Sequence, residues 1–517
     1  MNNSKLAIEQ TDQIDIQLID DHKEFPLEAI SSFFDAIHLK GIRYCHWKSN
    51  SRLDWGLTGR TDLDLLIDPT QESLFKKILA GLEIKKIVAP PLKQYPGLEH
   101  YLGFDSATGH LFHLHVHYNL ILGEQHVKNY RIPFEDKVLD LTQDKYGVKI
   151  PLPEVELIIL SIRAMLKYRD RDGVKDIFSI RFPGIPEHIL NELLWLLEQS
   201  SPEKLEKLLS ELSIFSDQNL ILEFLDVVKN APRDGWKLLS LRARLRKELR
   251  PYQRKSRIFA TFQYFRTLLQ NTRFFKGRKN QLLKFPNGGK LIAVIGIDGS
   301  GKSTHTVKLA KWLEWKVSAP LHYLGSKQPS LWSEWSYVIF RIFRRSNTIL
   351  SKRLGSEFFL ARILRKIRQF FLAAHYYSVG KDRLKRYKLG LEEAQKGSIV
   401  IFDRFPFFSP LDGPEIHLIP DEKLFYLPQK LSIMEKRLYQ QFNTLDQLLV
   451  LNVNPEVSVE RKPDHPMETI QSKFEALSRL KTELSEQPGQ FDRVQIDANM
   501  PLDQVNLALK RAVWSIL

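Results

Sequence analysis

The chain has 517 residues, 43% of them hydrophobic, and a formal net charge of +15. This length exceeds what one hydrophobic core organises, so two or three domains are expected. The single cysteine, Cys45, excludes an intramolecular disulfide and fits a reducing compartment. The chain has no run of 18 apolar residues and no apolar leader-like segment, so we expect a cytoplasmic protein, either free or peripheral to a membrane.

The apolar pattern divides the chain into four regions. Residues 27–150 alternate short apolar runs with a helical pattern, which predicts an α/β domain. Residues 151–240 carry apolar residues at helical spacing and predict a helical bundle. Residues 241–289 are predicted to be a basic linker, and strands and helices alternate from 290 to 517, as in a parallel sheet wrapped by helices. The predicted fold class is therefore α/β, with a helical bundle added to the N-terminal part.

The first segment with recognisable chemistry is "GRTDLDLLID", residues 59–68. Asp62 and Asp64 are two apart on an apolar strand, so both carboxylates point to one side and can share a divalent cation. Together with the preceding glycine and the upstream "YCHWKSN", this segment resembles the uncharacterised nucleotidyltransferases of the polymerase β type. The resemblance implies that the two carboxylates hold the metal ions of a nucleoside triphosphate. An acidic strand end on an unrelated α/β domain is the alternative.

The same resemblance implies a third carboxylate on a later strand, but the chain has His115 there, in "HLHVHYNL". Whether this domain catalyses nucleotidyl transfer or is degenerate therefore stays open. His113, His115 and His117 share one strand face, and same-face residues lie about 6.6 Å apart. Zn–N bonds are only ~2.0–2.1 Å, so three ligands from one strand converge on one ion only with strain. Metal binding, an altered substrate contact and simple packing are the three interpretations.

Positive charge is concentrated in residues 241–290, which hold 15 Lys and Arg against one acid, Glu248. A second basic and aromatic stretch runs from Trp332 to Tyr377. Amphipathic helices whose cationic side chains lie over apolar surface would explain both stretches. The alternative is an anionic partner, either a membrane surface or nucleic acid, engaged through residues 241–290.

The segment "IAVIGIDGSGKST", residues 292–304, places a glycine-rich turn between an apolar strand and a helical pattern. In such a loop, backbone N–H groups surround a β-phosphate, Lys302 reaches the β and γ oxygens, and Ser303 supplies an oxygen to Mg²⁺. The cofactors expected here are ATP and Mg²⁺. The predicted nucleotide-binding residues of the loop are Gly296, Gly299, Ser300, Gly301, Lys302, Ser303 and Thr304.

The strand "SIVIFDRF", residues 398–405, ends in Asp403 and Arg404. The carboxyl edge of an open parallel sheet lies beside the bound ligand, where a carboxylate can hold metal-bound water and an arginine can grip a phosphate. Arg383, in "VGKDRLKRY", is predicted to lie on a helix near the same edge. A surface ion pair at a strand end is the alternative.

From about residue 290 to 517 the chain resembles the thymidylate kinase family of P-loop nucleoside monophosphate kinases. The loop "GIDGSGKST", the "KDR" and "DRF" arginines, the strand "QLLVLNVNPEVSVER" and the closing "RVQIDANMPLDQV" carry the resemblance. It implies that Arg383 and Arg404 bind the acceptor and that Arg461 contacts adenine or phosphate. It also implies that the last strand and its adenine-side loop lie around Asp497 and Ala498. Asp298 would face the acceptor, where it accepts a hydrogen bond from a hydroxyl or stabilises the loop. The catalytic residues expected from this resemblance are Lys302, Asp403, Arg404, Arg383 and Asp298.

Departures from that family concern the acceptor. The acid that usually precedes the first loop glycine is Ile295, and "PFFSPLDGPEI" replaces the stretch that lines the thymine pocket. A site without its base-recognition groups loses discrimination steeply. We therefore expect ATP- and Mg²⁺-dependent phosphoryl transfer to a nucleotide, a sugar or a glycan- or lipid-linked acceptor. The alternative function is a nucleotide-gated binding protein that engages nucleic acid or membrane. The acceptor, the oligomeric state and the pathway are not predicted.

Overall fold

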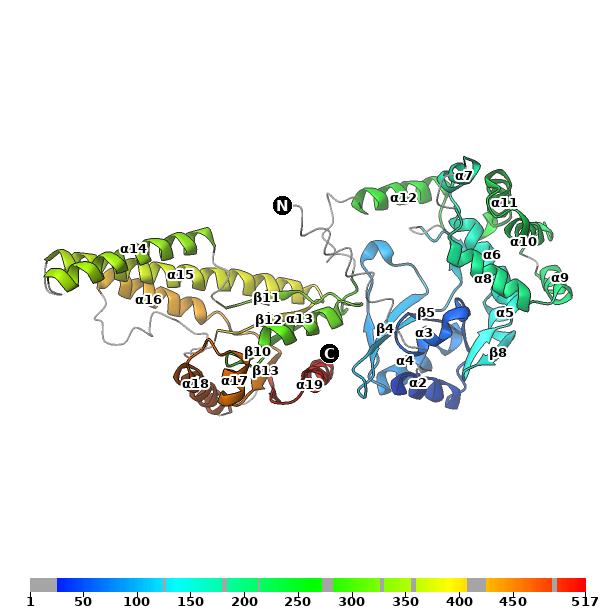
Figure 1. Cartoon of the computed structure of the whole chain (residues 1–517). Helices are drawn as coiled ribbons and strands as arrows, with labels where there is room; N and C mark the ends of the chain where they lie inside the picture. The colour runs from blue at the N-terminus through cyan, green and yellow to red at the C-terminus, as the bar shows by residue number, and fades with distance from the viewer. Residues whose placement is uncertain are drawn as a thin grey trace.

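The computed structural model describes residues 26–123, 127–178, 184–212, 214–271, 282–325, 330–354, 359–406, 425–485 and 491–517. The described chain forms two α/β halves, with a group of helices attached to the N-terminal half (Figure 1). In the described residues no helix is long and apolar enough to cross a membrane.

The N-terminal half is built on a five-stranded sheet of order β1-β2-β5-β4-β3. The strands are β1 (Tyr44–His46), β2 (Leu63–Ile67), β3 (Lys85–Ile87), β4 (Leu98–Phe104) and β5 (Leu111–His117). β2 and β5 are parallel, and every other pair in this sheet is antiparallel. The register sets Asp64 opposite His115 on the neighbouring strand, so the carboxylates and the histidines of the two motifs meet on one sheet.

Helices and small hairpins complete this half. The remaining elements up to residue 151 are α2 (Glu28–Leu39), α3 (Leu53–Leu57), α4 (Glu72–Gly81), β6 (Ile121–Leu122), β7 (Tyr130–Arg131), α5 (Glu135–Asp140), β8 (Thr142–Lys145) and β9 (Val148–Pro151). In α2 the buried residues Ile30, Phe33, Phe34 and Ile37 recur at helical spacing. That spacing presents one apolar face to the core.

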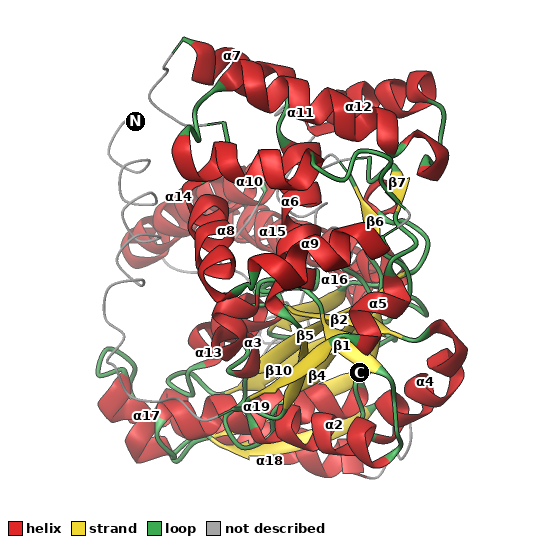
Figure 2. Cartoon of the chain, turned by 90° about the vertical axis from the view of Figure 1, so that its right-hand side faces the viewer, coloured by secondary structure: helices red, strands yellow, loops and turns green. Residues whose placement is uncertain are grey.

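The helical region follows, on the side of the sheet away from α2 and α4 (Figure 2). Its helices are α6 (Pro153–Lys167), α7 (Asp170–Ile177), α8 (Glu187–Gln199), α9 (Pro202–Glu211), α10 (Leu220–Asn230) and α11 (Gly235–Glu248). α6 is buried along almost its whole length, which explains why its apolar residues are continuous rather than confined to one stripe.

The predicted boundary at residue 240 between helical bundle and linker is wrong. α11 runs to Glu248, and its residues Leu241 and Leu245 are buried in the same core as α6. Arg242 pairs with Asp170, and Arg244 pairs with Asp217 and Glu223, so part of the basic charge neutralises acids of the bundle itself. In α11 the buried leucines recur at helical spacing but alternate with arginines. The high density of positive charge therefore makes this helix look like a linker in the sequence.

The rest of the basic stretch contains α12 (Arg257–Asn271), which exposes Ile258, Phe259 and Phe262. The segment 272–281 lies outside the described residues. Beyond it, two isolated β-bridges fix the start of the second half. Leu283 pairs with Val317 of the same half, and Lys284 pairs with Val88 of the N-terminal half.

The second half holds a five-stranded, fully parallel sheet of order β11-β12-β10-β13-β14. The predicted parallel sheet wrapped by helices is therefore confirmed. Its strands are β10 (Lys290–Gly296), β11 (Leu321–Tyr323), β12 (Ile399–Asp403), β13 (Gln447–Asn452) and β14 (Asp492–Asp497). Its helices are α13 (Lys302–Leu313), α14 (Leu331–Leu354), α15 (Phe359–Gln395), α16 (Tyr426–Tyr439), α17 (Pro455–Arg461), α18 (Met467–Ser485) and α19 (Leu502–Ile516). α14, α15 and α16 form an arm that projects away from the sheet (Figure 1).

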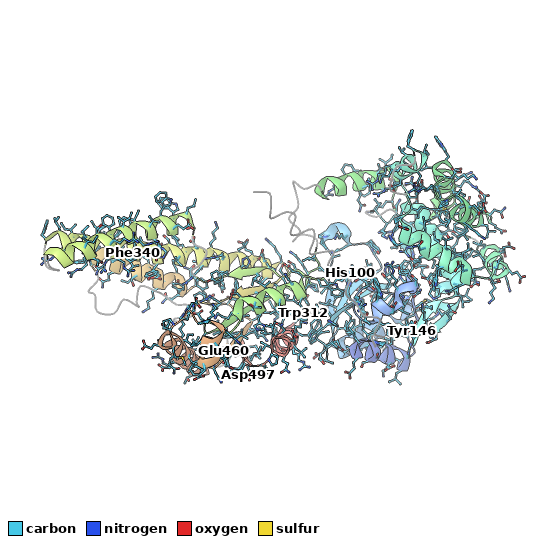
Figure 3. The ribbon with its side chains drawn as sticks, in the orientation of Figure 1. His100, Tyr146, Trp312, Phe340, Glu460 and Asp497 are labelled. Carbon is cyan, nitrogen blue, oxygen red and sulfur yellow. The ribbon has the colours of Figure 1, made fainter. Side chains whose placement is uncertain are left out.

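The two halves share a packed junction. Ile87, Leu102 and Leu111 of the N-terminal sheet belong to the same buried cluster as the second sheet. Trp312, labelled at this junction in Figure 3, packs edge-on against Phe104 and donates a hydrogen bond from Nε1 to the carbonyl of Gly109 at 3.0 Å. Because apolar burial and hydrogen bonds both cross it, the junction resembles a domain core more than a flexible link.

Candidate active site

The glycine-rich loop leaves the central strand β10 at its carboxyl end. Gly299 has φ +85° and Gly301 has φ +81°, values that residues with a Cβ rarely adopt. A Cβ on Gly296 would lie 2.6 Å from Ser300 Oγ, and one on Gly299 would lie 2.7 Å from the carbonyl of Ser458. Conformation therefore requires glycine at 299 and 301, and space requires it at 296 and 299.

α13 begins immediately after the loop. Gly301 gives it no side-chain cap, so the first N–H groups of the helix are available to an anion. Lys302 is buried, and its Nζ donates to the carbonyls of Gly296 at 2.8 Å and Ile297 at 2.6 Å. Lys302 thus lies across the glycine-rich loop where it is expected to contact the phosphates. Thr304 is exposed in the first turn of the same helix.

Ser303 and Asp403 meet beside this loop. Ser303 Oγ donates to Asp403 Oδ2 at 2.7 Å, and the other carboxylate oxygen of Asp403 is buried with no hydrogen-bond partner among the described residues. A hydroxyl and a carboxylate with a spare oxygen are the oxygen ligands that Mg²⁺ prefers. The donor set therefore fits this ion. Ser300 Oγ is also buried and unpaired in the described part of the chain.

A cluster of opposite charges surrounds Asp298. Its carboxylate accepts hydrogen bonds from Lys473 Nζ and, at 3.5 Å, from Arg404 Nη2. Burial alone would raise the pKa of Asp298, but the Lys473 hydrogen bond and the charges of Lys302, Lys473 and Arg404 hold it well below its usual range. A carboxylate with so low a pKa is a weak proton acceptor. These contacts favour the loop-organising interpretation of Asp298 over a role as base, and Ser458 Oγ adds a hydrogen bond to the Asp298 carbonyl.

Arg404 has a strained backbone, with φ +73° in a region costly for a side chain with a Cβ. Its N–H donates to the carbonyl of Val294 at 3.0 Å, and its guanidinium lies 5.8 Å from the ring centre of Tyr323. Arg404 directly follows strand β12, and its strained backbone directs the guanidinium towards Asp298 in the glycine-rich loop.

Arg383 is completely buried in α15, where its Nη1 donates to the hydroxyl of Tyr439 on α16. The charge of Arg383 and the hydroxyl of Tyr323 both act on Arg386, whose pKa is lowered mainly by burial. The hydrogen bond of Arg383 therefore joins α15 to α16 within the arm. The predicted pairing of two acceptor-binding arginines stays a prediction.

On the other side of the loop, Arg461 Nη1 donates to the carbonyl of Ala498 at 2.9 Å. Nearby, His305 Nδ1 and Asn506 Oδ1 lie 2.7 Å apart. The hydrogen bond of Arg461 joins the end of α17 to the residue that follows β14, and the nucleotide contact of Arg461 stays a prediction. The sequence analysis did not single out Ser458, His305 and Asn506, because no local motif connects them to the loop.

The N-terminal carboxylates are already engaged. Asp62 pairs with Lys316 at 2.5 Å and with His113 at 2.9 Å, and Asp64 pairs with Lys48 at 2.7 Å and with His115 at 3.1 Å. Burial opposes ionisation, yet these cations and hydrogen bonds hold the pKa of both carboxyls well below its usual range. Lys316 comes from the second half, so the two halves meet at this cluster.

The histidines of β5 do not converge as a set of three. Among the described residues, two groups have ligand atoms within 4.8 Å of one another, and His115 belongs to both. Their members are His100, His113 and His115 in one group, and Asp64, His115 and His117 in the other. Neighbouring strands complete each group, consistent with the strain expected for three ligands from one strand. Metal binding here stays a prediction, and in the second group Lys48 already pairs with Asp64.

A parallel sheet whose central strand leads through this loop into a helix defines a P-loop nucleotide-binding protein. A segment of 199 residues, 37% of this chain and 75% of the relative, is 30% identical to the "Uncharacterized ATP-binding protein YghR" of Escherichia coli strain K12. The chain belongs to the same family as YghR. The "Uncharacterized ATP-binding protein YghS" of the same strain is 25% identical over 250 residues, 44% of this chain and 94% of that protein.

No protein-family model matches the chain. Among solved structures, deoxyadenosine kinase from M. mycoides with bound dATP aligns with 43% of this chain and 98% of its own. The identity is 16% and the TM-score is 0.25, too low a score to support an argument.

Proposed function

We propose that the chain is a phosphotransferase that binds ATP with Mg²⁺ at the loop of β10 and transfers the γ-phosphate to an acceptor held near Arg404. One observation carries the proposal, namely the Ser303–Asp403 pair beside Lys302, with one oxygen of Asp403 left unpaired among the described residues. The names of the two relatives, both ATP-binding proteins, support the nucleotide.

Phosphoryl transfer depends on positioning and charge neutralisation more than on covalent chemistry by the protein. Lys302 would leave the loop carbonyls for the phosphate oxygens, and the open N–H groups of α13 would hold the β-phosphate. Mg²⁺, held through Ser303 and Asp403, supplies further positive charge to the phosphates when bound. Arg404 and Lys473, oriented by Asp298, would place cations on the opposite side of the transferred group.

The acceptor class remains a nucleotide, a sugar or a glycan- or lipid-linked phosphate acceptor. The segment that replaces the thymine-binding stretch, "PFFSPLDGPEI", lies almost wholly outside the described residues. The direct test is to incubate the protein with ATP labelled at the γ-phosphate, Mg²⁺ and fractionated metabolites, sugars and lipids, and to follow the label. If the labelled phosphate is transferred only to water in every fraction, the proposed kinase function is overturned and the protein is an ATPase.

A second candidate, nucleotide-gated docking on an anionic membrane, is favoured by the surface of the arm. α14 exposes Trp332, Trp335 and Ile342 on the same helix as Arg341 and Arg344, a composition typical of interfacial helices. Residues 241–290 are a weaker candidate, since Arg242 and Arg244 pair internally. Flotation with anionic vesicles over a salt series, with and without ATP, tests this candidate, and a short nucleic-acid duplex is the competing partner. Absence of binding to either at low salt would exclude it.

A further inference from the structure

The helical region contains a cavity that the phosphotransferase proposal does not use. It has a volume of about 410 Å³ and lies between α6, α7 and α8. Its charged lining is almost entirely basic, with Asp172 as the only carboxylate. The Lys and Arg residues that line it are Arg163, Lys167, Arg169, Arg171 and Lys175. Cavities of this size hold small ligands.

The one acid of the lining is already neutralised. Asp172 pairs with Arg169 at 3.2 Å and with Arg171 at 3.3 Å. Among the described residues, Arg163 and Lys167 form no ion pair, although both lie on α6 and face the same cavity. Cations gathered without counter-charges repel one another, and the arrangement is stabilised when an anion enters.

The basic character continues inward to the carboxylate cluster of the N-terminal sheet. Arg163 lies 5.5 Å and Lys48 lies 5.1 Å from the ring centre of Trp47, so one indole connects the cavity to the Lys48–Asp64 pair. Burial and the neighbouring cations lower the pKa of Lys128 to about 7 and that of Lys167 to about 8. Three acids oppose this field. Asp64 is held by Lys48, and burial raises the pKa of the other two, to about 7 for Glu156 and above its usual value for Glu192, so their negative charge is reduced.

We propose that this cavity binds a phosphorylated small molecule, with its phosphoryl group between Arg163 and Lys167 and the rest of the ligand extending along α7. The guanidinium offers a planar fork to phosphate oxygens, and the ammonium offers a mobile point charge. A volume of about 410 Å³ is that of a small-ligand site rather than of a surface for a nucleic-acid duplex. This site is separate from the P-loop and does not depend on the phosphotransferase proposal.

Calorimetric titration with pyrophosphate counts the sites. The full-length wild type is expected to bind two equivalents, one at the loop and one in the cavity. The double variant Arg163→Gln/Lys167→Gln should lose the second, with Kd there rising about tenfold or more, whereas Lys302→Ala should lose the first. The control Lys204→Gln/Lys229→Gln removes the same charge from exposed positions of α9 and α10 and should keep both. An unchanged second equivalent in the Arg163/Lys167 variant would overturn the proposal.

A measurement on the unaltered protein guards against misfolding of the variant. Because the pKa of Lys167 is lowered to about 8, its amine should react with an acylating reagent at neutral pH faster than surface lysines. Pyrophosphate should slow that reaction at least severalfold, while Lys204 is unaffected. ATP and a hexose 1-phosphate, tested in parallel, distinguish a nucleotide from a sugar phosphate. If none of the three compounds slows the acylation of Lys167, the proposal is also overturned.

Discussion

The two α/β halves carry carboxylates near the ends of parallel strands, yet their surroundings differ. Asp403 keeps one oxygen without a partner in the described residues and shares the other with Ser303. Asp62 and Asp64 each receive a lysine and a histidine. A lysine ammonium neutralises a buried carboxylate, as a bound metal ion also would. A pair of carboxylates in the sequence is therefore a stronger sign of a metal site where the fold leaves their negative charge without a cation.

The largest effect is expected from Lys302→Ala. Without this cation, the γ-phosphate loses one of its main stabilising charges, and phosphoryl transfer should fall about a thousandfold. Turnover of labelled ATP with the identified acceptor measures it, and the thermal midpoint of unfolding checks that the variant is folded. Full activity in the variant would mean that this loop is not the active site.

Paired substitutions of the two kinds of carboxylate test the comparison itself. Asp403→Asn keeps the hydrogen bond from Ser303 but removes the charge, so transfer should fall about a hundredfold and a higher Mg²⁺ concentration should be needed. Asp64→Asn should leave kinase turnover within about twofold, since its charge is balanced by Lys48. Equal losses in both variants would show that the N-terminal cluster takes part in the same reaction.

Thymidylate is expected to be a poor acceptor, with kcat/KM on the order of a hundredfold below that of the true acceptor. The reason is the absent base-recognition stretch after Arg404. The measurement is steady-state kinetics with thymidylate beside a panel of sugars and lipid-linked glycans. Thymidylate turnover as fast as that of the best acceptor would restore the simpler nucleotide kinase.

The sequence predicted those elements whose structure is determined by residues close together in the chain. A buried apolar run followed by glycines and Lys302 determines the strand, loop and helix locally, so these and the parallel sheet followed from the pattern. The Asp298–Lys473 and Asp62–Lys316 pairs join residues far apart in the chain, and no local period encodes them. The boundary predicted at 240 is wrong because a run of positive charge does not end a helix: the leucines of α11, which runs to Glu248, keep a helical period.

The cavity cations were also missed, for a related reason. Arg163 and Lys167 are one helical turn apart on α6, and an isolated helix with such a pair usually shows a solvated face. Only the packing of α7 and α8 around them turns that face into a cavity. Long-range packing thus decided the electrostatics of both candidate sites.

The smallest expected effect is a pH dependence that comes from one buried acid of the N-terminal half. Burial raises the pKa of Glu156 to about 7, although Asn50 donates two hydrogen bonds to its carboxylate. An acid with a folded pKa above its unfolded value of ~4.3 binds protons preferentially when folded, so its contribution to stability is present at low pH and lost as the pH rises through about 7.

The contribution of Glu156 to the free energy of unfolding should therefore fall as the pH rises from about 5 to about 7, by an amount on the order of 1–3 kcal/mol. Buried histidines whose pKa is lowered, such as His113 and His117, act with the opposite sign, so the effect is read as the difference between the wild type and Glu156→Gln. The measurement is the thermal midpoint as a function of pH, with Glu198→Gln on the exposed side of α8 as the control that keeps the wild-type slope. A slope that Glu156→Gln leaves unchanged would mean that another group titrates, and the difference between the two halves would then not lie in this buried acid.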